Sequence, residues 1–479
     1  MRARYCNTSS REVTRPERNA ACNSGIVAST TVKLRSLASA EAVAHTTMSA
    51  SDSFMAADFS PPERYHASMI EWNETHLGIR DAMRRFIAAE VVPHLDELEH
   101  GGMPPYDILR KLMKTFGIAD LARTRFARQI EKQREREAGG EPAAAKPPGP
   151  SPEAAMEVAM RLIPTIELCR YSPGMVTAMG VSVGLTSAAI NARGTIRQRE
   201  RWALPLMTME TIGAWAITEP GSGSDAFGGM RSSARRDGDG YLLNGSKTFI
   251  TNGPYADTIV FICKLDEPGV AANDRKIVSF ILDKGMPGLT QSKPLRKMGL
   301  HGSPTGELFV ADLRADKERL IGETEDQPAR SGAKETFTME RTGVAAMALG
   351  IVEECRKLSL EYARTRVQFG KPIGEFQLIQ DKLAKMEVAR MNLQNLVFRQ
   401  IELAGAGKSL DLAEASACKL YSAQAAMEVC LEAVQLFGGN GYMAEFQVEQ
   451  LCRDAKVLQI YGGTDEIQIS QIARSLLGG

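Results

Sequence analysis

The chain has 479 residues, which is too long for one small core and fits two or three packed domains. Its 58 basic and 58 acidic residues give a formal net charge of +0 at pH 7, so no basic excess is available to bind nucleic acid. The sequence contains no uninterrupted apolar run of the length that a bilayer requires. We therefore expect neither a nucleic-acid partner nor an integral membrane segment.

Residues 1–60 are rich in Ser, Thr, Ala and Arg, poor in acidic residues, and without a sustained hydrophobic period. They resemble a transit peptide, but they equally fit translated upstream sequence, since Met48 and Met55 are plausible starts. We expect a disordered extension or a mis-assigned start, and a bacterial cytoplasmic protein. A mitochondrial matrix protein is the alternative if the segment is a transit peptide.

Residues 61–204 are expected to form a helical domain, because the hydrophobic pattern is helical from Glu63 to Ala122 and again from Pro152 to Trp202. Between these stretches, residues 126–152 are first highly charged and then rich in Pro, Gly and Ala. This composition predicts an inserted mobile surface loop.

Residues 205–325 have a different texture, in which short β-prone runs alternate with Gly and Asp turns. Such spacing predicts a small, mostly antiparallel barrel or sandwich. The runs are GAWAIT, YLLNGS, KTFITN, TIVFICKL, KIVSFIL and GELFVADL.

Residues 326–479 return to a helical pattern. Apolar side chains at spacings of three and four predict one buried stripe on each of two helices, followed by a third helix over about 410–436 and two shorter ones. The helix–β–helix order without βαβ alternation predicts an α+β fold, mostly α, with a C-terminal four-helix bundle. The stripes are Val344, Ala348, Ile351, Cys355, Leu358 and Tyr362, then Met386, Ala389, Leu393 and Val397.

Cysteine and histidine usage restricts the chemistry. The eight cysteines contain no CxxC pair, which favours free thiols in a reducing compartment. Five of the six histidines lie within the first hundred residues, and only His301 lies beyond them. A Ser-His-Asp triad or a histidine-rich metal site therefore has little raw material, and we expect no metal. Chemistry in the main body has to use a carboxylate, a hydroxyl, a lysine or a bound cofactor.

Four segments have compositions suited to ligand binding. Residues 216–225 (AITEPGSGSD) form a glycine-rich loop after a strand, where backbone N–H groups can meet a ligand, although a tight turn has the same composition. Residues 247–253 (KTFITNG) place an aromatic and a threonine on one strand face, which suits a flat ring but also an ordinary strand.

The other two segments lie in the helical C-terminal part. The arginines of residues 364–372 (RTRVQFGKP) can bind phosphate or simply complement a helix dipole. Residues 435–442 (QLFGGNGY) and 460–466 (IYGGTDE) are glycine-rich breaks beside helices, where free amides can meet a phosphate or a ribose.

In this order and spacing, the four segments closely resemble the acyl-CoA dehydrogenase family over about residues 65–479, apart from the insertion. The resemblance implies FAD held between a helical domain, a β domain and a four-helix bundle. It also implies an acyl-CoA substrate, an electron-transferring flavoprotein as acceptor, and a homotetramer built as a dimer of dimers.

Matching positions suggest roles for individual residues. Those implied to line the flavin are Trp215, Ile217, Thr218, Ser224, Phe249, Thr251, Thr464 and Glu466. Those implied to bind the pyrophosphate and adenosine across a subunit interface are Arg366, Phe369, Gln377, Gln435 and Gly439. Those implied to meet the acyl-CoA are Ser224, Arg341, Tyr461 and Gly462.

The catalytic base is the decisive residue, because a carboxylate has to remove the α-proton while a hydride leaves the β-carbon for flavin N5. Many members place this glutamate after the tyrosine of the last motif, where this chain has Gly462. Isovaleryl- and long-chain-type members place it on the first long bundle helix, before an arginine. Glu340 precedes Arg341 at that position, so it is the predicted base, with a pKa raised by burial. A surface glutamate paired with a basic neighbour is the alternative.

Two departures from the family pattern bear on substrate contacts. Thr338 stands where some members carry an aspartate that touches CoA, and His301 replaces a common arginine. The helix-borne base favours a branched or medium-to-long acyl-CoA. The competing functions are a flavin oxidase or monooxygenase of the same fold and a non-catalytic scaffold.

Overall fold

A computed structural model describes residues 71–138, 149–326 and 329–478. The extension expected at residues 1–60 lies outside this range. The described residues all belong to one compact unit within residues 65–479.

The first part of this unit is helical. A serine N-cap and a proline in the first turn start α5, since Ser151 accepts a hydrogen bond from the backbone of Ala154. The helices are α1 (Glu74–Glu90), α2 (Leu95–Glu99), α3 (Tyr106–Thr115), α4 (Ile118–Glu137), α5 (Pro152–Cys169), α6 (Pro173–Met179), α7 (Ser187–Arg193), α8 (Ile196–Gln198) and α9 (Leu204–Met207), with π-helical turns η2 (Gly180–Thr186) and η3 (Arg199–Ala203).

The prediction of a loop over residues 126–152 is wrong for the first part of this range. Helix α4 continues to Glu137, because Phe126 and Ile130 are buried on its inner face while the charged residues of this stretch lie on its outer face. Residues 139–148 lie outside the described residues.

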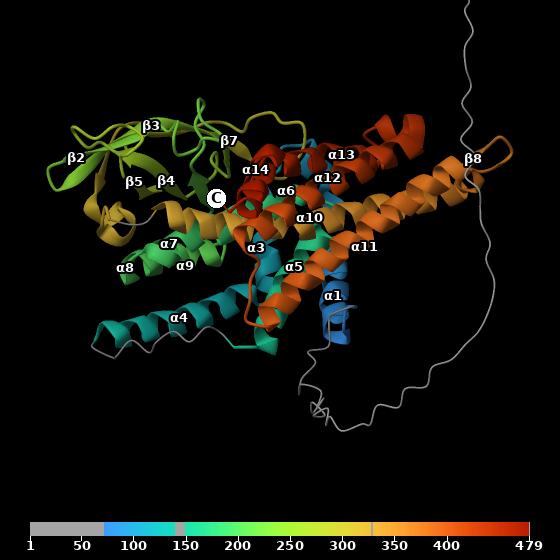
Figure 1. The fold of residues 1–479 in the computed structure, drawn as a ribbon, viewed down its shortest axis with the longest axis horizontal. Helices are drawn as coiled ribbons and strands as arrows, with labels where there is room; N and C mark the ends of the chain where they lie inside the picture. The colour runs from blue at the N-terminus through green and yellow to red at the C-terminus, as the bar shows by residue number, and fades with distance from the viewer. Residues whose placement is uncertain (1–70, 139–148, 327–328, 479) are drawn as a thin grey trace, which may run out of the picture. The chain divides into compact units, whose positions relative to one another are not determined.

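The middle part is one seven-stranded sheet (Figure 1). Four of its strand pairs are antiparallel, as expected, and two are parallel. The YLLNGS and KTFITN runs form a single strand, β3, rather than two. The strands are β1 (Gly213–Ala216), β2 (Ser233–Asp237), β3 (Gly240–Thr251), β4 (Thr258–Leu265), β5 (Ile277–Asp283), β6 (Leu289–Gln291) and β7 (Thr305–Asp316), in the order β1-β4-β2-β3-β7-β6 with β5 on β4.

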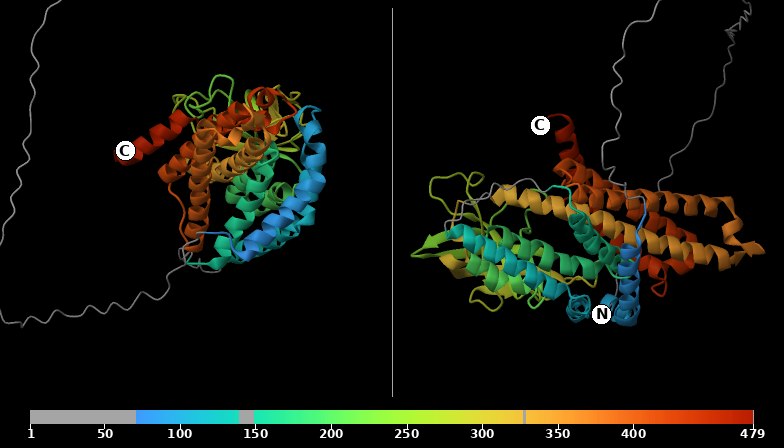
Figure 2. Two further views of the ribbon diagram at one scale, coloured as in Figure 1. Left: turned by 90° about the vertical axis from the view of Figure 1, so that its right-hand side faces the viewer. Right: turned by 90° about the horizontal axis from the view of Figure 1, so that it is seen from below.

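The last part contains the long helices, which run away from the sheet in Figures 1 and 2. Both predicted apolar stripes lie in the main hydrophobic core, which confirms their assignment. The elements are α10 (Ala329–Thr365), the hairpin β8 (Val367–Gln368) and β9 (Lys371–Pro372), α11 (Gln377–Gly405), α12 (Leu412–Phe437), α13 (Gln447–Lys456) and α14 (Asp465–Leu476). The observed fold is the expected α+β arrangement, mostly α.

One stretch within the described residues, Pro173–Arg193, has the length and apolar composition of a membrane-crossing helix. Sequence inspection did not single it out. In the structure this stretch comprises α6, η2 and α7, and it packs against β1, where Ser182 Oγ accepts the backbone N–H of Gly213. Met175 and Ile190 are fully buried in the protein core, so the packing explains the apolar composition.

A close helix contact provides a test of this packing. Gly350 in α10 lies against α5, and an added Cβ would overlap the carbonyl oxygen of Ile166. We expect Gly350→Ala to lower stability by about 1–3 kcal/mol despite its better helix propensity. The matched control is Gly78→Ala at an exposed position of α1, where nothing lies within 4 Å of an added Cβ and a gain of about 0.5–1 kcal/mol is expected. Thermal melting measures both, and equal shifts would contradict the packing.

Candidate active site

A buried ion pair holds the glycine-rich loop after β1. The Lys247 ammonium donates to Glu219 Oε1 at 2.9 Å and to the carbonyl oxygen of Ile217 at 3.0 Å. Glu219 also accepts the backbone N–H groups of Arg231 and Ser232, at 2.7 and 2.9 Å. Burial alone would raise the pKa of Glu219, but the hydrogen bonds and the Lys247 charge outweigh burial and lower the pKa. The ionised pair of Glu219 and Lys247 therefore fixes the loop to strand β3.

The glycines of this loop face open space. No atom lies within 4 Å of a Cβ added at Gly221 or Gly223, and Ser224 is exposed. Backbone N–H groups in such a cradle can approach a flat or anionic ligand closely.

An irregularity in β3 presents an aromatic ring beside the loop. The pairing register with β7 shifts between Lys247 and Ile250, and Phe249 has a φ of 56°. Its side chain is 70% exposed although both neighbours in the strand are buried. The backbone N–H of Thr248 donates to the carbonyl oxygen of Thr218 at 3.0 Å, which joins β3 to the loop. A strained residue that exposes a ring indicates a ligand surface.

This backbone hydrogen bond joins two of the segments expected at the flavin, the glycine-rich loop and the strand that carries Phe249. Trp215 and Ile217 pack on one apolar cluster beneath the loop. Thr251 ends β3 and pairs with Thr305 of β7. These groups fit a flavin ring, because they combine an exposed apolar ring with open backbone amides over a rigid base.

Glu340 in α10 meets the turn that precedes α14. A Cβ added at Gly462 would lie 3.3 Å from Glu340 Cδ and 3.4 Å from Oε1, so the absent side chain leaves the space that the carboxyl group uses. Glu340 is partly buried, and burial raises its pKa to about 7 against the opposing effects of Arg341 and Lys419. The carboxyl group is therefore poised to exchange a proton near neutral pH.

Several contacts fix this turn. Gly462 and Gly463 have φ values of 62° and 89°, and Gln468 Nε2 donates to both of their carbonyl oxygens at 3.0 and 2.8 Å. The Tyr461 hydroxyl donates to Met347 Sδ at 3.4 Å. Thr464 is the N-cap residue of α14, and Glu466 is exposed in its first turn.

Arg341 is buried beside Glu340, and its Nη1 donates to Ser416 Oγ of α12 at 2.9 Å. Thr338 lies two residues before Glu340 on α10 and is partly buried. The role predicted for Arg341 at the CoA group stays a prediction.

The residues expected to hold the pyrophosphate and adenosine lie at the other end of α10. Arg366 and Gln377 are exposed beside the β8–β9 hairpin, and Phe369 at its tip is 93% exposed with a φ of 52°. Gln435 and Gly439 are exposed at the end of α12.

One tyrosine joins the end of α12 to the end of α10. Asn440 Nδ2 donates to the Tyr362 hydroxyl at 3.0 Å, one turn before Arg366. About 25 helical residues separate this group from Glu340, which corresponds to roughly 38 Å along the helix axis. One chain therefore presents the two groups at separate places.

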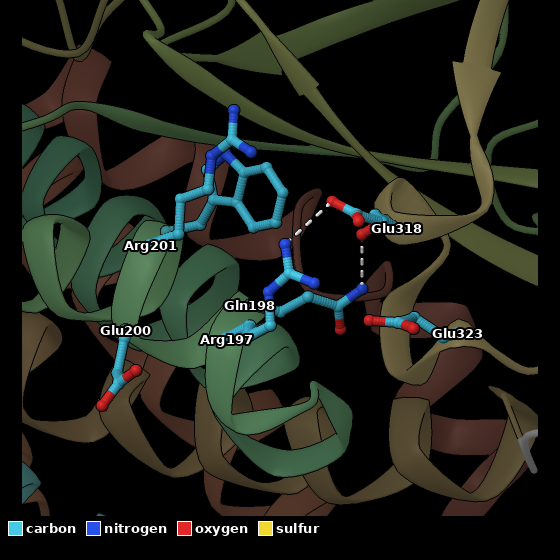
Figure 3. A pocket seen from close by; sticks show the side chains of 7 residues that line it. Arg197, Gln198, Glu200, Arg201, Glu318 and Glu323 are labelled. Carbon is cyan, nitrogen blue, oxygen red and sulfur yellow. Dashed lines mark hydrogen bonds and ion pairs between the residues drawn. The ribbon is translucent and has the colours of Figure 1, made fainter.

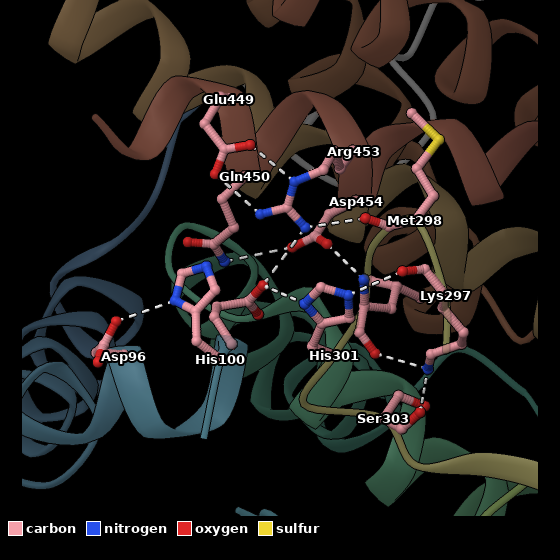
Figure 4. Close-up of polar contacts among 12 residues, drawn as sticks. Asp96, His100, Lys297, Met298, His301, Ser303, Glu449, Gln450, Arg453 and Asp454 are labelled. Carbon is pink, nitrogen blue, oxygen red and sulfur yellow. Dashed lines mark hydrogen bonds and ion pairs between the residues drawn. The ribbon is translucent and has the colours of Figure 1, made fainter. Parts of the chain in front are cut away.

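His301 lies in a cluster of charged and polar side chains. Its Nε2 is 3.0 Å from the carbonyl oxygen of Lys297, and its Nδ1 is 3.3 Å from Glu99 Oε2 (Figure 4). Arg453 and the buried Asp454 of α13 join the same cluster, where burial raises the pKa of Glu99 to about 8. His301 thus contributes to a polar junction between α2, the segment before β7, and α13.

One surface cavity also lies away from these residues. It has a volume of about 360 Å³ and lies beside η3 and the short helices η4 (Lys317–Arg319) and η5 (Ile321–Glu323) (Figure 3). Arg197, Glu318 and Trp202 are among its lining residues, and none of the predicted site residues lines it. Arg197 and Glu318 pair with each other at 3.2 Å, so the cavity offers no unpaired charge from these two residues.

Sequence reasoning missed the groups that support the site. Glu219 stood inside the glycine-rich motif, four residues after Trp215, yet it was not assigned a role. Lys419 was also missed, although a charged residue between the buried Ala415 and Ala423 of α12 was a detectable signal.

The combination of a helical part, a sheet with an open glycine loop, and a helical bundle fits a flavin-dependent oxidoreductase. Family comparison agrees. The model for the acyl-CoA dehydrogenase C-terminal domain matches residues 331–477, and that for the middle domain matches residues 214–313.

Similar proteins cover most of this chain. Isovaleryl-CoA dehydrogenase from Oryza sativa subsp. japonica is 31% identical over 411 residues, which is 86% of this chain and 93% of the relative. The caffeyl-CoA reductase-Etf complex subunit CarC from Acetobacterium woodii is 34% identical over 85% of this chain and 99% of the relative. Among solved structures, butyryl-CoA dehydrogenase from Megasphaera elsdenii has a TM-score of 0.71 at 32% identity and covers 85% of this chain and 99% of that one.

The chain belongs to the acyl-CoA dehydrogenase family. It is accordingly an enzyme, a flavin-dependent acyl-CoA dehydrogenase that uses FAD.

The buried pair below the glycine loop yields a prediction. We expect Glu219→Gln to leave the Lys247 charge without its partner, at a cost of about 3–5 kcal/mol. The melting temperature and the FAD retained after gel filtration should both fall. Glu200→Gln, which breaks an exposed pair with Arg134, is the control and should change neither. Wild-type flavin content in Glu219→Gln would show that the pair does not support the loop.

Proposed function

We propose that the protein oxidises an acyl-CoA thioester to its trans-2-enoyl-CoA, with Glu340 as the base that removes the α-proton. The observation that carries this proposal is the Glu340 carboxyl group in the space beside Gly462, with a pKa near 7. Bound FAD supplies the acceptor for the hydride that leaves the β-carbon.

The protein's own groups prepare the proton transfer. Partial burial keeps the carboxyl group basic enough to take the proton of a weak carbon acid, and Arg341 beside it opposes a further rise in pKa. Gly462 leaves room for the ligand's α-carbon near the carboxylate, and Tyr461 and Ser224 are the proposed acyl-CoA contacts.

The proposed substrate is a branched or medium-to-long acyl-CoA. The position of the base supports this class, because isovaleryl- and long-chain-type members share it. An electron-transferring flavoprotein is the proposed acceptor, supported by the relative that is named as a subunit of a reductase-Etf complex. An oxidase is distinguished by consumption of oxygen with acyl-CoA.

We also propose that FAD is shared between two subunits in a homotetramer. This arrangement is supported by the exposed group at the far end of α10, which within one chain lies roughly 38 Å along the helix from Glu340. The members of this group are Arg366, Phe369, Gln377, Gln435 and Gly439. A partner copy can bring them to the flavin site.

Replacement of the base tests the mechanism. Glu340→Gln should retain FAD but slow flavin bleaching by about 10²–10⁴-fold, because an amide cannot accept the proton. In the wild type the rate should rise with pH through about 7, because the carboxylate form increases. Anaerobic stopped-flow mixing with isovaleryl-CoA, butyryl-CoA and palmitoyl-CoA measures both and ranks the substrates. Normal bleaching in Glu340→Gln would refute the assignment.

The adjacency of Glu340 and Gly462 permits a second test. The double variant Glu340→Gly, Gly462→Glu should return a carboxylate to the same space, so it should bleach at least about tenfold faster than Glu340→Gly alone. The positive φ at position 462 costs about 1–2 kcal/mol for a residue with a Cβ, so the rate should stay below that of the wild type. A double variant that binds FAD yet bleaches no faster than the single variant would show that the two positions do not serve one site.

A further inference from the structure

Lys419 is a buried charge that the proposed reaction does not use. It lies near the middle of α12, and its side chain is 0% exposed. Lysine is almost never fully buried without an opposing charge, because desolvating an ammonium group is costly. The carboxylate beside it is Asp465, whose Oδ1 lies 3.4 Å from Nζ.

This pair is connected to Glu340 from two sides. On the α12 side, Arg341 next to the base donates to Ser416, one turn before the lysine. On the α14 side, Asp465 follows three residues after Gly462, which lies against the Glu340 carboxyl group. The base therefore lies where α10, α12 and the turn before α14 converge.

Asp465 is itself held in place. Gln459 Nε2 and Gln424 Nε2 donate to its Oδ2 at 3.1 and 3.3 Å, so Oδ1 remains for the lysine. Because Gln424 belongs to α12 and Gln459 to the segment before the turn, these bonds fasten the turn to α12. Lys419 is thus one of three side chains that bond to Asp465, and it is buried.

The charges around the carboxyl group come from three elements. Burial raises the pKa of Glu340 to about 7, and the positive charges of Arg341 and Lys419 oppose the rise. Burial likewise lowers the pKa of Lys419, while Asp465 and Glu340 oppose that change. The groups that face this site are Arg341 on α10, Lys419 on α12, Tyr461 in the turn, and Asp465 and Glu466 on α14.

We propose that Lys419 is a positioning residue for Glu340: held by Asp465, its ammonium provides a fixed positive charge on the α12 side of the base and fastens the glycine turn below it. The inference rests on the proposed role of Glu340. The lysine does not contact the acyl group in this scheme. It favours the ionised form of the base, so that proton abstraction proceeds at neutral pH.

The first test is the pH profile of flavin reduction in Lys419→Met. Without the positive charge the carboxylate is less stable, so the apparent pKa should rise by about one unit and the rate below pH 7 should fall about tenfold. The rate should recover at high pH. Lys419→Arg keeps the charge and should return the profile toward that of the wild type. Lys111→Met, which removes an exposed lysine of α3, is the control.

The second test uses the isosteric variant Asp465→Asn, which removes the negative charge and leaves Lys419 in place. The apparent pKa should then shift downward, opposite to the shift in Lys419→Met. A purely structural pair would give rate or stability losses in both variants without opposite shifts. This variant decides the question even if Lys419→Met fails to hold FAD.

Two outcomes overturn the inference: an apparent pKa unchanged within about 0.2 units in folded, FAD-bound Lys419→Met, or a shift in Asp465→Asn that is absent or upward. Each is assessed with isovaleryl-CoA and butyryl-CoA beside Glu340→Gln. If Glu340→Gln bleaches normally, the proposed function has failed. If it is inactive while the lysine and aspartate variants keep the wild-type profile, only the role of Lys419 has failed.

Discussion

The site depends on one steric relation, the absence of a side chain at Gly462. Any Cβ at this position would contact the carboxyl group of Glu340, which reaches across from a different helix. The glycine also allows the positive φ that the turn requires. The position of Glu340 on α10 and the conformation of the turn before α14 are therefore two parts of one arrangement.

Much of the fold could be predicted because its signals are local. The apolar stripe from Val344 to Tyr362 reports the face that a helix buries, and the short β-prone runs between turn residues report strands, which is enough to assign each element. The end of α4 was harder to predict. Its outer face is almost entirely charged, and only Phe126 and Ile130 reveal that one side packs inward. Because the buried face of this helix end is narrow, most of its residues are charged, and that composition is also typical of a loop.

The site residues also differ in how far the sequence could predict them. Gly462 and Glu340 could be assigned together because the resemblance links two alternative positions for one base. His301 could not be placed, because its contact with Glu99 joins residues about two hundred positions apart and depends on how α2, the segment before β7, and α13 pack. Contacts of that kind follow from tertiary geometry, and no local pattern reports them. Lys419 lies between these cases, since a charge among the buried residues of α12 signals a partner without naming it.

Helix α10 connects the Glu340 region to the Arg366 region without interruption, so it acts as a ruler between them. Loss or gain of one residue between these positions would turn one end against the other by about 100° and shift it by about 1.5 Å. A length change in a connection between helices leaves this spacing along α10 unaltered. Among descendants of this sequence, insertions and deletions should therefore accumulate in the connections and be eliminated from this helix, whatever happens to its individual side chains.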